Sequence, residues 1–125
     1  MTGDFAAVLA VLKPVLATYV DRLAVTADTP AEYALATKSP SPFPQHKGQP
    51  LHFGSVRVGK AYVSFHLMPV YMSPALTKGM SPALKKRMQG KSCFNFKNDP
   101  GPDLIDELKR LTEAGFNQWK DNGWV

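Results

Sequence analysis

The stretch that decides the fold is residues 51–68, LHFGSVRVGKAYVSFHLM, where two alternating segments flank a Gly-Lys pair. Alternation of apolar and polar side chains over such short segments predicts β-strands, here at residues 51–58 and 61–68. A two-residue loop at Gly59-Lys60 makes them a hairpin and places His52 opposite Leu67. Strand side chains alternate between faces, so one face becomes the apolar core side. The other face then carries Phe53, Ser55 and Arg57 beside Tyr62, Ser64 and His66.

The chain before this hairpin predicts one helix and two strands. Apolar residues recur at helical spacing between Phe5 and Leu23, with Pro14 inside, so the helix kinks or restarts at the proline. Residues 23–27 and 32–38 have strand composition and are separated by a turn. Residues 39–50 contain four prolines, which predicts a long, stiff loop of irregular structure.

The chain after the hairpin predicts short helices, a fifth strand and a long helix. Pro69 ends the strand, and Ser-Pro pairs at 73–74 and 81–82 predict the starts of two short helices. Residues 91–97 alternate, so Phe94 and Phe96 point to the core, and Cys93 and Asn95 to the polar face. The apolar stripe of residues 102–115 predicts the last helix, and residues 116–125 add a turn in which Trp119 and Trp124 pack back onto the domain.

These elements predict a single α+β domain over residues 1–125. We expect an antiparallel sheet of about five strands, with the long N-terminal and C-terminal helices on one face. One cysteine excludes an internal disulfide and favours the cytoplasm, and the longest apolar run, residues 5–12, is far shorter than the roughly 20 residues that span a bilayer. The first residues lack the basic segment of a signal peptide.

The charge pattern points to an anionic partner. The net charge is +5, yet residues 33–98 contain ten Lys and Arg side chains and no Asp or Glu. Such a segment attracts nucleic acid, phosphorylated metabolites or an acidic protein, although a well-solvated surface has the same composition. Part of the pattern is a basic cluster made of Lys78, Lys85, Lys86, Arg87 and Lys91.

Two segments also carry a family resemblance. Residues 58–71, VGKAYVSFHLMPVY, and residues 81–97, with LKKRMQGKSCF inside, resemble a bacterial family of unknown function, the YdhG-like proteins. The resemblance covers roughly residues 12–116. Some members are labelled frataxin-like iron chaperones, which implies an α-sheet-α sandwich and iron held by an acidic helix ridge. The first helix offers only Asp4 and Asp21, at opposite ends, so the sequence shows no such ridge.

The favoured function is binding without catalysis, with no cofactor and no bound metal. The polar sheet face would take an anionic small molecule or an acidic protein partner, because basic groups beside aromatic rings suit phosphate contact and stacking. Single-stranded nucleic acid is a further candidate, and a homodimer through the same face is an alternative. The expected ligand-binding residues are Arg57, Lys60, Tyr62, His66, Lys91 and Asn95.

The sequence also contains residues that could serve catalysis or metal binding. An enzyme could use Cys93 as nucleophile and His66 as base if their strands pair. The histidines at 46, 52 and 66 have no metal-site spacing, and His52 falls on the predicted apolar face. The acidic residues Asp99, Asp103, Asp106 and Glu107 could hold a divalent cation, but the dipole of the first helical turn is the favoured explanation of these carboxylates.

Overall fold

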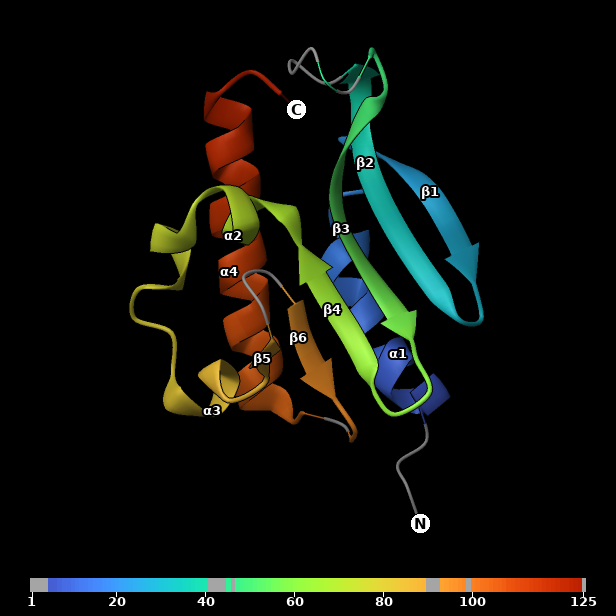
Figure 1. The fold of residues 1–125 in the computed structure, drawn as a ribbon, viewed down its shortest axis with the longest axis vertical. Coiled ribbons are helices and arrows are strands. Elements are labelled where there is room, and N and C mark those ends of the chain that lie inside the picture. The colour runs from blue at the N-terminus through green and yellow to red at the C-terminus, as the bar shows by residue number, and fades with distance from the viewer. Residues whose placement is uncertain (1–4, 41–44, 46, 90–92, 99, 125) are drawn as a thin grey trace.

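A computed structural model of the chain describes residues 5–40, 45, 47–89, 93–98 and 100–124. Alternating segments form the strands of one antiparallel sheet, in the order β1-β2-β3-β4-β6-β5 (Figure 1). The strands are β1 Leu23–Thr29, β2 Glu32–Pro40, β3 Pro50–Val58, β4 Val63–Leu67, β5 Met88–Gln89 and β6 Cys93–Phe96. The expected α+β class is therefore confirmed, and the sheet has six strands where five were predicted.

Two long helices, α1 Phe5–Ala17 and α4 Pro102–Asp121, contact each other and cover one face of the sheet (Figure 1). α1 is continuous through Pro14, and the Thr18 hydroxyl donates to the Pro14 carbonyl oxygen at 3.0 Å just beyond its end. On the sheet side, Phe53 packs edge-on against Trp119 of α4, with ring centroids 5.3 Å apart. The core consequently lies between these helices and one face of the sheet.

The β3–β4 hairpin has a four-residue loop, so the two-residue loop predicted from the sequence is wrong. Val58 pairs with Val63, and the Gly59 amide donates to the Tyr62 carbonyl oxygen at 2.8 Å. Two-residue hairpin turns require positive φ at their first central residue, and Gly59 does not adopt it. Because the register moved by two residues, the side chains from Val56 onward keep their predicted faces.

A bulge at Phe53 reverses the faces at the start of β3. β3 pairs with β2 at Leu35↔Gly54 and then at Ala36↔His52, so Phe53 is an extra residue. Phe53 is fully buried on the helix side, while His52 lies on the opposite face. The predictions that His52 faces the core and that Phe53 borders the polar face are therefore wrong.

The segment after β4 contains three short helical elements where two were predicted. α2 Met68–Met72 begins directly at the strand end with Pro69 in its first turn, and η2 Pro74–Thr77 and α3 Pro82–Lys85 follow. The Ser81 hydroxyl oxygen caps α3 by accepting from the Leu84 amide at 3.2 Å. Pro69 thus starts a helix as well as ending a strand.

α4 continues to Asp121, six residues beyond the predicted end at Gly115. A Cβ at Gly115 would lie 2.6 Å from Cβ of Pro69, so this glycine permits close contact between α4 and α2. Trp119 is 1% exposed within the helix, and Trp124 packs against its ring. The two tryptophans pack onto the domain as predicted, but a helix, not a turn, places Trp119.

Candidate functional site

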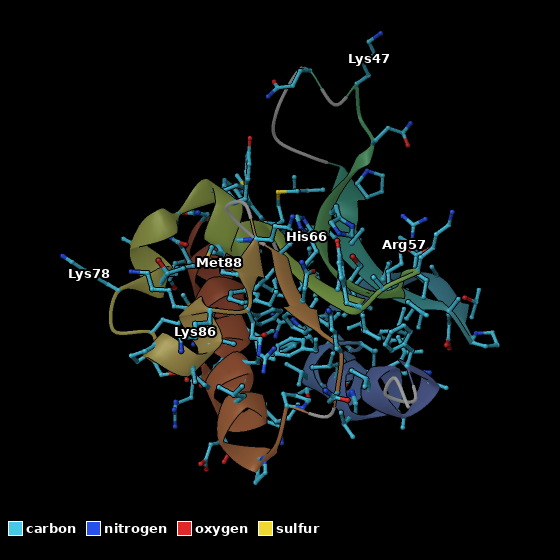
Figure 2. The ribbon with its side chains drawn as sticks, turned by 60° about the horizontal axis from the view of Figure 1, so that its bottom comes forward. Lys47, Arg57, His66, Lys78, Lys86 and Met88 are labelled. Carbon is cyan, nitrogen blue, oxygen red and sulfur yellow. The ribbon has the colours of Figure 1, made fainter. Side chains whose placement is uncertain are left out.

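One face of the sheet has neither long helix against it, and we call it the open face. In Figure 2, the side chains of Arg57 and His66 stand on this face, away from α1 and α4. The register brings polar residues of neighbouring strands together, because Ser64 pairs with Asn95 and His66 pairs with Cys93. The described polar side chains of the open face include His52, Ser55, Arg57, Ser64, His66, Gln89, Cys93 and Asn95, with Glu32 of β2 beside Arg57.

At the middle of the open face, side chains are joined by hydrogen bonds. The Ser64 hydroxyl donates to Oδ1 of Asn95 at 2.9 Å, and the Asn95 amide donates to Oε1 of Gln89. The amide of Asn95 is therefore oriented by two protein partners. Gln89 was not expected here, because its two-residue strand is too short to show alternation.

Next to this network, the His66 ring lies between Cys93 and His52. Nδ1 of His66 is 3.2 Å from Sγ of Cys93, and its ring stacks on His52 with centroids 5.5 Å apart. Burial lowers the pKa of both imidazoles, and the neighbouring His66 lowers that of His52 further, against an opposing effect of Glu32. Both rings thus favour the neutral form at pH 7, in which His66 can accept the thiol proton.

A small hollow, the turn hollow, lies at one end of the open face. It has a volume of about 300 Å³ and is lined by Arg57, Gly59, Lys60, Ala61, Tyr62 and Ser64. Arg57 and Lys60 are exposed, whereas Tyr62 is half-buried. Glu32 lies directly across from Arg57 in the β2–β3 register. Three of the six expected ligand-binding residues, Arg57, Lys60 and Tyr62, therefore meet at one place.

A larger cavity, the apolar pocket, lies where β3 begins and α2 follows β4. Its volume is about 560 Å³, and its lining is Gln45, Gln49, Pro50, Leu51, His52, Met68, Tyr71 and Met72. This pocket was not expected from the sequence, because α2 was not predicted and His52 was expected on the core side. The available signal was Met68-Pro69, since proline is common in the first turn of a helix.

The basic residues that the structure describes are not gathered at one place. Lys78 and Lys86 lie on the short helical segments, away from Arg57 and His66 (Figure 2). Lys91, an expected binding residue and a member of the basic cluster, lies outside the described residues, as do His46 and Asp99. The structure thus separates Arg57 and Lys60 from the positive charges around α3.

The carboxylate of Glu107 is engaged in structure. Its two oxygens accept from the Ser81 amide at 2.7 Å and from the Ser81 hydroxyl at 2.6 Å, which ties α3 to α4. Asp103 and Asp106 are exposed on α4. Within the described ranges, no group of three or more His, Cys, Asp or Glu side chains could hold a metal ion.

No protein-family model matches the chain, and neither the curated proteins nor the solved structures contain a match to it. In the part of the chain that the structure describes, no helix is long and apolar enough to cross a membrane.

Proposed function

We propose that this chain is a non-catalytic binding module that takes a small anionic ligand at the turn hollow. The observation that carries the proposal is that Arg57 and Lys60 line one hollow together with Tyr62. A guanidinium binds phosphate or carboxylate through paired N–H donors, and a nearby ammonium adds a second positive charge. Tyr62 offers a ring on which a planar part of the ligand can stack.

Two of the remaining expected residues act indirectly in this proposal. His66 and Asn95 do not line the hollow. The Ser64 hydroxyl donates its hydrogen bond to Oδ1 of Asn95, so Ser64 presents only oxygen lone pairs to the hollow and gives an anion no donor. The anion would therefore contact Arg57 and Lys60, while Asn95 holds the hydroxyl hydrogen of Ser64.

The test is a titration with inorganic phosphate and with AMP at low salt, followed by NMR. We expect binding that weakens as salt is added, and a loss of at least about tenfold when Arg57→Glu and Lys60→Glu are combined. The matched control, Lys78→Glu with Lys86→Glu, changes the net charge equally at residues that lie away from Arg57 and should bind as the wild type does (Figure 2). Glu32→Gln should strengthen binding, since it removes the carboxylate across from Arg57.

Equal loss in the two double variants would contradict the turn hollow as the site. If no small anion binds, the acidic protein partner becomes the better form of the proposal. Sedimentation at several concentrations separates both forms from a homodimer built through the open face.

A second candidate function, an enzyme using Cys93 and His66, is favoured by the 3.2 Å contact between Sγ and Nδ1. A base at this distance can take the thiol proton and create a nucleophile. The measurement is the rate of alkylation by iodoacetamide at pH 7. Fast alkylation that is lost in His66→Ala would support the enzyme, whereas the slow rate of an ordinary thiol would support the binding module.

The proposal also includes a family relation and a cellular location. A relation to the YdhG-like proteins and their frataxin-like sandwich is supported by the quoted sequence segments and by two long helices on one sheet face. A cytoplasmic location is supported by the single cysteine.

A further inference from the structure

The apolar pocket shares no lining residue with the turn hollow and has a different chemistry. Among the described residues that line it, none is Lys, Arg, Asp or Glu. Its volume of about 560 Å³ falls within the range of small-molecule sites, roughly 300–1,000 Å³. A charged ligand would lose hydration there and gain no opposite charge from the wall, so the wall favours a neutral molecule.

One wall of the pocket comes from α2. Met68 and Met72 are four residues apart in this helix, so their side chains lie on the same side of it, and both line the pocket. Tyr71 also lines it and is 55% exposed, which is unusual for so large a ring. Thioethers and a phenol ring make favourable contacts with aromatic rings, so this wall suits a flat aromatic molecule.

The rest of the lining supplies a few polar groups. His52 comes from β3, and its ring is held by stacking on His66 at 5.5 Å. Gln45 and Gln49 add side-chain amides, each of which can donate and accept hydrogen bonds. A small number of polar groups in an apolar cavity orients a ligand that has nitrogen or oxygen atoms at the edge of its ring.

We infer that the apolar pocket binds a neutral, planar heteroaromatic small molecule, with its ring against Met68, Tyr71 and Met72 and its polar edge toward His52. This site is independent of the proposed anion site, because the two lie at different ends of β3. A molecule of two fused rings is small enough for the volume of this pocket.

The probe is indole, a neutral fused ring with one N–H donor, titrated into the full chain by NMR. We expect saturable shifts at amides of α2 and of the start of β3. Indole-3-acetate carries the same ring and a carboxylate, and it should bind at least about tenfold more weakly. Stronger or equal binding of indole-3-acetate would contradict the inference that the ligand is neutral. Shifts that do not saturate would contradict the inference that the pocket is a specific binding site.

Substitutions test whether indole binds in the apolar pocket. Tyr71→Ala removes an exposed ring, so the fold should persist while indole binding weakens about fivefold or more. Val25→Ala is the matched control, since Val25 is also large, apolar and exposed but does not line the pocket. The Arg57→Glu, Lys60→Glu pair should leave indole binding unchanged. If Tyr71→Ala binds indole as the wild type does, or if the charge pair abolishes indole binding, the inference is wrong.

Discussion

The two faces of the sheet differ in what determines their residues. On the helix side, Phe53, Phe65 and Phe94 are fully buried. On the open face, their strand neighbours Ser64 and Asn95 are polar, half-buried and hydrogen-bonded to each other. Burial of large apolar side chains stabilises the fold, and this alone explains why the residues of the first face are apolar. Stability does not require hydrogen-bonding groups on the second face, which is therefore where binding residues can accumulate.

The largest expected effect tests this difference within one strand. Phe65→Ala removes a fully buried ring and leaves a cavity, so we expect the free energy of unfolding to fall by about 3–5 kcal/mol. Ser64→Ala, one residue earlier on the open face, removes one hydrogen bond and should cost only about 1 kcal/mol. Urea unfolding of both variants provides the comparison. Similar losses in the two would mean that the open face is as important to stability as the core.

The next effect concerns the link between α3 and α4, outside both faces. Glu107→Ala removes the carboxylate that accepts two hydrogen bonds from Ser81, so we expect a loss of about 2 kcal/mol. Asp106→Ala, exposed on the same helix, should change stability by less than about 0.5 kcal/mol. Thermal unfolding measures both. An Asp106 effect equal to that of Glu107 would show that general helix charge, not the contact with Ser81, sets the result.

A smaller effect is expected where α4 meets α2. Alanine is normally better than glycine in a helix by about 1 kcal/mol. At Gly115, however, the new Cβ would lie 2.6 Å from Cβ of Pro69, so Gly115→Ala should lower stability by about 1–2 kcal/mol after local relaxation. Ala114→Gly, on the exposed side of the same turn, tests the propensity alone and should also cost about 1 kcal/mol. A stabilised Gly115→Ala would show that the two helices separate easily.

Alternation and helical spacing predicted the strands and long helices of the covered face, because burial imposes a period on the sequence. These two patterns gave wrong predictions where a single residue interrupts the period. The bulge at Phe53 moved His52 to the open face, and the signal was Gly54, since glycine inside a strand often marks a bulge. Gly115 resembles a helix end in the sequence, whereas Gly123, with φ of 79°, lies just beyond the real end of α4.

The candidate site was only partly predictable for a different reason. Arg57, Lys60 and Tyr62 come from one hairpin, so their proximity follows from local sequence. The apolar pocket joins β3 to α2 through tertiary packing, which no period in the sequence reveals. The run of basic residues was uniform in sequence, but the fold turns Lys78 and Lys86 away from Arg57 (Figure 2).

The smallest expected effect is a pH dependence that arises on the open face alone. Burial lowers the pKa of His52 and His66 from the ordinary value of 6.5, so the unfolded chain binds protons that the folded chain resists. The stability that these two neutral imidazoles contribute should therefore be fully present above pH 6.5, and the free energy of unfolding should fall as the pH drops below that value.

Replacing both residues, as His52→Gln with His66→Gln, removes these two groups and should flatten the pH dependence of the free energy of unfolding below pH 6.5. Urea unfolding over a pH series that spans 6.5 measures the difference between variant and wild type. Parallel curves would mean that the stacked imidazoles open to water before the chain unfolds, and that the open face responds to protons independently of the core beneath it.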